Sequence, residues 1–236
     1  MVRDRKPAQK PLALLACTAA IAIAAGAVTA QSEKGSGTGL GANEIVDRVQ
    51  AYYAEISDYR AAFVQTIAHK LFAGRLERSY GDVLFKKGGL MRWEYTRPER
   101  KLFVYDGATL WIYEPEVPQA FKAAANADRL RKALAFLSGE GKIKDSYKVV
   151  KLDAARFSFA PGYVLKLTPT EKGSPFKRVE LYVDSTDFHV ARSVVVDHEG
   201  NRNRFDFSNP VRSSGIAASL FSFTPPAGVP VLEATE

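Results

Sequence analysis

GDVLFKKGGLMRWEY, residues 81 to 95, contains two apolar segments on either side of a Lys-Lys-Gly-Gly sequence. Adjacent glycines with polar neighbours favour a turn. After the turn, Met91, Trp93 and Tyr95 alternate with charged residues. A period of two is typical of a β-strand that buries one of its two faces. The stretch therefore predicts a β-hairpin whose second strand has one apolar face.

Short alternating segments continue in both directions from this hairpin. Upstream, Tyr59, Ala61, Phe63, Gln65 and Ile67 follow an imperfect period of two. Downstream, the apolar segment 102–105 ends at Asp-Gly, a strong hairpin signal, and segment 110–113 follows it. Further short segments, each bounded by turn residues, occupy 163–167, 179–183, 188–190, 194–196 and 205–207.

These short strands and tight turns predict one antiparallel sheet, in which alternation places one face in the core and the other in water. A twisted sheet of about ten strands curls or splits, and curling gives a barrel or a half-barrel. We therefore expect a mainly β protein with helices, of the α+β class. About 200 residues after the N-terminal segment are enough for one domain with a sizeable core.

Two amphipathic helices are expected to cover the apolar face of this sheet. The first runs from Asn43, the expected N-cap, to Ser57, and the second runs from Ala127 to Leu137. Residues 115–124 are expected to be irregular. Two interpretations of the covered face stay open: a solid core of sheet and helix, or a cavity with a helical lid.

Residues 1–30 have the layout of a secretory signal peptide, with a basic start, an apolar run and small residues up to Ala30. Residues 31–41 are rich in Gly and Ser and are expected to form a flexible linker before a single domain at 42–236. Cys17 is either a chance residue of the apolar run, which we favour, or a lipidated cysteine. We expect an exported protein, without a disulfide if cleavage follows Ala30.

The sequence contains no catalytic constellation, and we do not expect an enzyme. Its histidines are His69, His189 and His198, and it has neither a Gly-x-Ser-x-Gly elbow nor an HExxH motif. His189 and His198, with neighbouring acids, offer a candidate metal set, but surface positions explain them better, so we expect no metal. The net charge of +7 falls to +4 without residues 1–30 (29 Lys and Arg against 25 Asp and Glu), which is too small to indicate nucleic-acid binding.

Several collinear motifs give the chain a resemblance to a known family. Residues 81–95 and the segment VYDGATLWIYEP at 104–115 resemble two blocks of the outer-membrane lipoprotein carrier protein (LolA) family. Residues 59–65 are similar to its first strand, 133–139 to its lid segment and 221–228 to its C-terminal signature.

The resemblance implies both a fold and a task. The fold would be an unclosed antiparallel β-barrel, or half-barrel, with a helical lid over a hydrophobic cavity. The task would be that of a periplasmic chaperone, a monomer without cofactors that binds lipoproteins by their acyl chains. It would receive them from an inner-membrane ABC complex and deliver them to an outer-membrane acceptor lipoprotein. The alternative is an anchored acceptor, or a general lipid-binding or sensor protein of the same fold.

A cavity of this kind would be lined by the aromatic and apolar residues of the strands and the lid. Sealed core packing is the alternative for each of them. The proposed lipid-binding residues are Met91, Trp93, Tyr95, Phe63, Trp111 and Leu134.

Lys87 stands where the family has an Arg that holds the lid, and Gly88 stands where the family has Pro. Lys lacks the planar multi-donor fork of Arg. Our hypothesis is that Lys87 contacts segment 133–137 as a lid latch, and that the closed lid is weaker than is usual for the family. An exposed turn lysine is the alternative.

Overall fold

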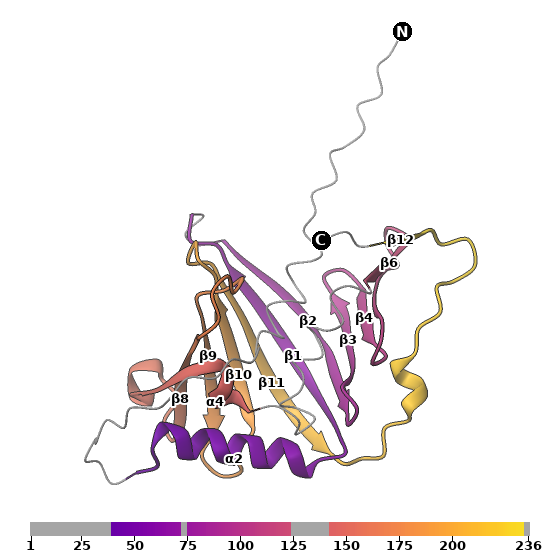
Figure 1. Cartoon of the computed structure of the whole chain (residues 1–236). Helices are drawn as coiled ribbons and strands as arrows, with labels where there is room; N and C mark the ends of the chain where they lie inside the picture. Colours follow the sequence, from indigo (N-terminus) through magenta and orange to yellow (C-terminus); the bar gives the residue numbers. More distant parts are fainter. Residues whose placement is uncertain (1–38, 72–74, 124–141, 234–236) are drawn as a thin grey trace.

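The computed structural model describes residues 39–71, 75–123 and 142–233. The predicted signal peptide 1–30, most of the predicted linker 31–41, and the predicted helix Ala127–Leu137 lie outside these residues. The described part folds into one curved sheet, with helices α2 and α4 and the 3-10 segments η1 and η2 (Figure 1).

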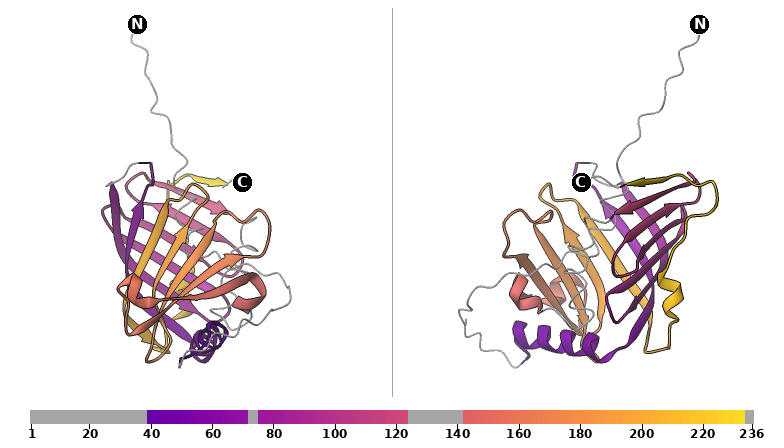
Figure 2. Two further views of the ribbon diagram at one scale, coloured as in Figure 1. Left: turned by 90° about the vertical axis from the view of Figure 1, so that its left-hand side faces the viewer. Right: turned by 45° about the vertical axis from the view of Figure 1, so that its right-hand side comes forward.

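The sheet has twelve strands in the order β12-β6-β5-β4-β3-β2-β1-β11-β10-β9-β8-β7. β7 and β12 occupy its two ends and do not pair with each other, so the sheet is unclosed, as predicted. Figure 2 shows how it curls into a half-barrel. The strands are β1 Asp58–Ala68, β2 Leu76–Lys86, β3 Leu90–Arg97, β4 Lys101–Tyr105, β5 Leu110–Glu114, β6 Gln119–Ala123, β7 Tyr147–Leu152, β8 Gly162–Pro169, β9 Arg178–Asp184, β10 Val190–Val196, β11 Arg202–Arg212 and β12 Val231–Glu233.

The first hairpin forms as its alternation predicts. In β3, Met91, Trp93 and Tyr95 are buried, whereas the residues between them are partly exposed. Gly88 and Gly89 in the turn have φ values of 90° and 74°, a conformation that glycine adopts without a steric cost. β2 and β3 then pair antiparallel. The predicted hairpin is confirmed.

Three details of the predicted sheet are wrong. Residues 119–123, expected to be irregular, form β6, which pairs with β5. Segments 188–190 and 194–196 do not form two strands, because Val190–Val196 is a single strand, β10. The last pair is parallel, not antiparallel, because β12 returns to lie beside β6. β12 and β6 are short strands that lie far apart in the chain. The alternation of residues within a strand does not indicate which distant strand it pairs with.

Helix α2, Ala42–Glu55, lies across the ends of the strands on one side of the sheet (Figure 1). We call this side the inner face and the opposite side the outer face. The N-cap is Gly41, not the predicted Asn43, and no side chain caps the helix. The apolar stripe of α2 packs with the inner face into the main core; the buried stripe is Ile45, Val46, Val49, Tyr52 and Tyr53.

The short helix α4, Ile143–Ser146, extends this cover. The backbone N–H of Ile143 donates to Gln50 Oε1 of α2 at 3.2 Å, and Lys144 Nζ lies 2.6 Å from a carboxylate oxygen of Asp47. Leu40, within the predicted linker, packs against the main core. In the described residues, no helix combines the length and the apolar character needed to cross a bilayer.

The outer face is partly covered, although the alternation of apolar and polar residues predicted that it would be exposed to solvent. Val164, Tyr182, Val194 and Val196 form a second buried cluster there. The segment η1, Ala154–Phe157, packs against this cluster. β8, β9 and β10 therefore carry apolar residues on both faces, which is typical of strands that are buried on both sides.

The C-terminal segment covers the outer face at the other half of the sheet. We call residues 213–230 the strap; it follows β11, contains η2 (Ala218–Phe221) and leads into β12 (Figure 1). Phe221 is 1% exposed. The ring of Phe223 lies 5.7 Å from Trp111 and 5.3 Å from Tyr113 between centroids.

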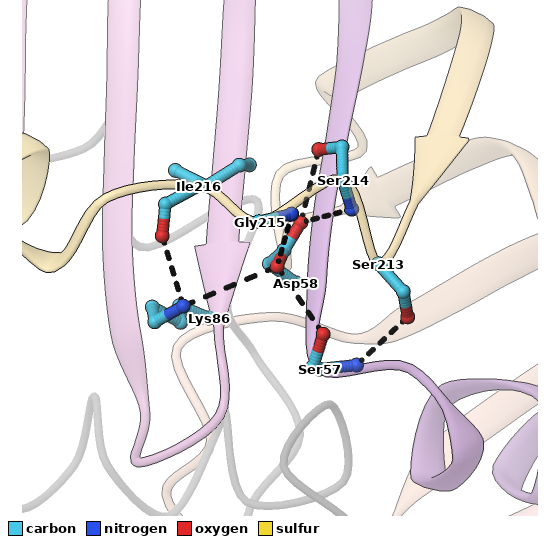
Figure 3. A network of polar contacts seen from close by, with 7 residues as sticks. All are labelled: Ser57, Asp58, Lys86, Ser213, Ser214, Gly215 and Ile216. Atoms are coloured by element: carbon cyan, nitrogen blue, oxygen red, sulfur yellow. Dashed lines mark hydrogen bonds and ion pairs between the residues drawn. The ribbon is translucent and has the colours of Figure 1, made fainter.

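Asp58, the first residue of β1, anchors the start of the strap (Figure 3). The residue is 2% exposed, and its carboxylate accepts hydrogen bonds from Ser214 N (2.8 Å), Ser214 Oγ (3.0 Å) and Gly215 N (3.1 Å). Lys86 Nζ lies 4.0 Å from Asp58 Oδ2 and donates to Ile216 O at 2.9 Å. Burial alone would raise the pKa of Asp58, but the hydrogen bonds hold it below its usual value.

Candidate functional site

An aromatic cluster occupies the inner face of the sheet. The ring of Phe63 lies 5.0 Å from Trp93, 4.9 Å from Tyr95 and 5.7 Å from Phe205 between centroids. Trp93 lies 5.1 Å from Phe205, and Met91 is buried with them in the main core. The structure therefore brings together four of the predicted lipid-binding residues, Phe63, Met91, Trp93 and Tyr95. We call these four the wall residues.

Gly81 makes room for this cluster. It pairs with Phe63 of β1 on one side and with Tyr95 of β3 on the other. A Cβ atom at Gly81 would lie 2.7 Å from Phe63 Cζ and 2.1 Å from Glu94 O, well inside van der Waals contact. Because Gly81 has no side chain, the ring of Phe63 can lie against the backbone of β2.

Helix α2 meets the sheet through neutral tyrosines. Tyr53 Oη accepts a hydrogen bond from the backbone N–H of Val190 at 3.3 Å, and the Tyr53 ring lies 6.1 Å from that of Tyr59. Burial raises the pKa of both hydroxyls well above the usual value for tyrosine. Both side chains are therefore uncharged at pH 7, and this contact between α2 and the sheet is made by apolar packing and a neutral hydrogen bond.

The wall residues are buried. Met91 is 0% exposed and Tyr95, the most exposed of the four, is 7% exposed. A small cavity of about 10 Å³ lies where the end of α2 meets β1 and β2, between Tyr53, Tyr59 and Phe85. This cavity has room for about one water molecule.

Trp111 is not part of this site. In β5 it alternates with Leu110 and Ile112, which are buried in the main core. Trp111 therefore lies on the outer face, where its ring contacts Phe223 of the strap. The prediction that it lines the inner face is wrong, because the apolar run 110–113 has no period that identifies its inward side.

The lid and its latch stay predictions. Leu134 and the segment 133–137 lie outside the described residues. Lys87 is exposed in the turn between β2 and β3, and its backbone N–H donates to Ser57 O at 2.9 Å. Lys87 is one of the residues that line the small cavity at the end of α2.

Sequence reasoning did not assign Phe205 or Gly81 to the site. Phe205 belongs to β11, which lies beside β1 although more than a hundred residues separate them in the chain. The alternation in residues 205–207 predicted a strand but did not indicate which strand it pairs with. For Gly81, a glycine inside a strand was the available signal, because such a residue often marks a close approach of another backbone or side chain.

The histidines do not form the candidate metal set of the sequence. His189 precedes β10 and His198 follows it, so the strand separates them. His189 instead lies near Asp184 and Asp187, with ligand atoms within 4.8 Å of one another. Asp184 Oδ1 accepts from Thr186 N at 2.7 Å, and Asp187 pairs with the ring of His189. Such local contacts of aspartate side chains with nearby residues are typical of a turn.

The fold and the site define a class of protein: a β half-barrel with unpaired ends whose aromatic inner face is covered by a helix. Comparison with known families gives the particular family. The model of the outer membrane lipoprotein carrier protein LolA matches residues 54–224. The chain belongs to this family, as its motifs predicted.

Individual relatives agree with this assignment. An outer-membrane lipoprotein carrier protein of Chromobacterium violaceum is 29% identical over 187 residues, covering 79% of this chain and 86% of the relative. An outer-membrane lipoprotein carrier protein of Methylibium petroleiphilum is 28% identical over 214 residues, covering 91% of this chain and 95% of the relative. An uncharacterized conserved protein of Thermus thermophilus has a similar fold, with a TM-score of 0.51, 18% identity and coverage of 81% of this chain and 98% of that one.

Proposed function

We propose that this protein is a periplasmic carrier that binds the acyl chains of lipoproteins against the inner face of its half-barrel. It takes them from an inner-membrane ABC complex and passes them to an outer-membrane acceptor. The observation that carries the proposal is the aromatic inner face under a helical cover, in a chain whose relatives are outer-membrane lipoprotein carrier proteins.

Physical chemistry explains why such a carrier is needed. Each acyl CH₂ group transferred into water costs about 0.8 kcal/mol, so one long chain costs on the order of 10 kcal/mol. A carrier has to replace most of this free energy with its own apolar surface. Phe63, Trp93 and Tyr95 offer large apolar areas, and Met91 adapts its shape to variable chains.

The packed state of the site suits release as well as binding. Contacts between the buried wall residues compete with the acyl chain for the same apolar surface, so that bound cargo can be released. A neutral contact such as that of Tyr53 with Val190 can separate and form again without desolvation of a charge. The unpaired edges β7 and β12 allow the sheet to widen without breaking a closed ring of hydrogen bonds.

The experiment that tests this proposal mixes the secreted form of the protein with inner-membrane vesicles that carry lipoproteins and the ABC complex. With ATP, we expect soluble complexes of carrier and lipoprotein, recovered by gel filtration. Met91→Gln, which places a polar amide on the inner face, should lower their yield several-fold. Glu94→Gln, on the outer face of the same strand, is the matched control and should not. If ATP yields no soluble complex with the unchanged protein, the proposed function is wrong.

A further inference from the structure

Trp93 has a buried hydrogen-bond donor without a partner. Within residues 39–71, 75–123 and 142–233, Trp93 Nε1 is the only buried side-chain nitrogen or oxygen that makes no hydrogen bond. The residue is 3% exposed. Buried donors are almost always paired in folded proteins, so an exception at the centre of a candidate site calls for an explanation.

Aromatic rings surround the indole ring of Trp93. Its ring lies 5.0 Å from Phe63, 5.1 Å from Phe205, 6.2 Å from Phe85 and 6.2 Å from Phe207 between centroids. The face of an aromatic ring is a weak acceptor compared with a carbonyl oxygen. The donor therefore lacks a full partner in the packed state.

Other polar groups of the core are satisfied. Tyr105 Oη donates to Gly107 O at 2.9 Å, and Tyr53 Oη accepts from Val190 N at 3.3 Å. A phenylalanine at position 93 would fill most of the space of the indole without burying an unpaired donor. The indole N–H thus has a cost in the packed protein, and a ligand acceptor would remove it.

We propose that Trp93 Nε1–H binds the carbonyl oxygen that joins an acyl chain to its head group. This inference rests on the proposed function and adds the chemical class that the site recognises. Acyl chains of lipoproteins are attached through ester and amide bonds, and both present a carbonyl oxygen as a strong acceptor. The carbonyl sits at Trp93, and the hydrocarbon lies along the neighbouring rings of Phe63, Tyr95 and Phe205.

This contact gives the site a preference that apolar packing alone does not provide. An ether-linked alkyl chain has nearly the same apolar surface as an acyl chain but no carbonyl oxygen. A site that only buries hydrocarbon binds the ether-linked and the acyl chain alike. A site with an unpaired N–H donor prefers the acyl chain. One neutral hydrogen bond corresponds to a difference in affinity of about 3- to 10-fold.

The test compares two synthetic probes, a dipalmitoylglyceryl-cysteine peptide and its dihexadecyl ether analogue. Affinity for each is measured with the secreted form of the protein, with Trp93→Phe, and with Trp111→Phe as the matched control on the outer face. We expect the unchanged protein and Trp111→Phe to bind the diester about 3- to 10-fold more tightly than the diether. In Trp93→Phe, the two affinities should become equal.

A spectroscopic measurement keeps the inference testable if Trp93→Phe does not fold. In Trp111→Phe, the remaining indole N–H signal should shift downfield on binding of the diester and much less on binding of the diether. Equal affinities, or a preference for the diester that persists in Trp93→Phe, would overturn the inference and leave the proposed function intact. If neither probe binds at all, the proposed function fails together with the inference.

Discussion

Replacing Gly81 with alanine is expected to lower the free energy of unfolding by about 3 kcal/mol, as severe overpacking of a core does. The new Cβ would lie 2.1 Å from the backbone oxygen of Glu94 and 2.7 Å from Phe63 Cζ. Neither neighbour can move cheaply, because the oxygen belongs to β3 and the ring is held by Trp93 and Tyr95. Urea unfolding followed by circular dichroism measures the loss.

Gly41→Ser provides the matched control for this substitution. A Cβ at Gly41 would meet no atom within 4 Å, and the residue is an N-cap at which serine is favourable. Its stability should therefore change by less than about 0.5 kcal/mol. If Gly81→Ala proves as mild as Gly41→Ser, the close packing of Phe63 against β2 is not a feature of the protein.

Removing the carboxylate of Asp58 should have an effect of similar size. Asp58→Ala leaves the N–H groups of Ser214 and Gly215 and the Ser214 hydroxyl without their acceptor, at a cost of about 3 kcal/mol. The strap should then separate from β1 at its start. Thermal unfolding measures the loss of stability, and limited proteolysis should cut between residues 213 and 230 sooner in the variant.

The contribution of Asp58 should depend on pH in a defined direction. Because its pKa is lower in the folded protein than in the unfolded chain, the stabilisation is fully present above the unfolded carboxyl pKa of about 3.9. It is lost as the pH falls through the folded pKa. The stability difference between the unchanged protein and Asp58→Asn should therefore be constant at neutral pH and shrink below about pH 4.

Asp82→Ala is the control for Asp58. Asp82 lies one strand away and pairs with Arg60 at 3.5 Å, but both side chains are exposed to solvent, at 37% and 57%. Such a pair contributes less than about 1 kcal/mol. Equal losses for Asp58→Ala and Asp82→Ala would show that the network in Figure 3 does not hold the strap.

The elements with strong local signals could be predicted from the sequence. In the hairpin of β2 and β3, apolar and polar residues alternate along β3, and two glycines with positive φ form the turn. Both signals lie in neighbouring residues of the sequence. Helix α2 was predicted within two residues at each end, because its apolar stripe is regular. The curled, unclosed sheet followed from the number of strands together with the resemblance to a family.

The features that could not be predicted from the sequence depend on contacts between distant segments. β12 is three residues long and joins the sheet through β6, about 110 residues earlier in the chain. Trp111 was a second choice for the cavity wall, after Trp93, and only the alternation of burial in β5 places it on the outer face. The unpaired donor of Trp93 depends on side-chain packing around it, which no pattern along the chain reports.

The central claim is that an acyl chain lies against the inner face when the protein carries its cargo. The most direct measurement uses a diacylglyceryl peptide with brominated acyl chains, because bromine quenches the fluorescence of a tryptophan that it touches. Trp111→Phe reports on Trp93 alone, and Trp93→Phe reports on Trp111 alone. We expect binding to quench the fluorescence of Trp93 strongly and to leave that of Trp111, on the outer face, unchanged. Binding that quenches Trp111 but not Trp93, or no binding under any condition, would contradict the central claim.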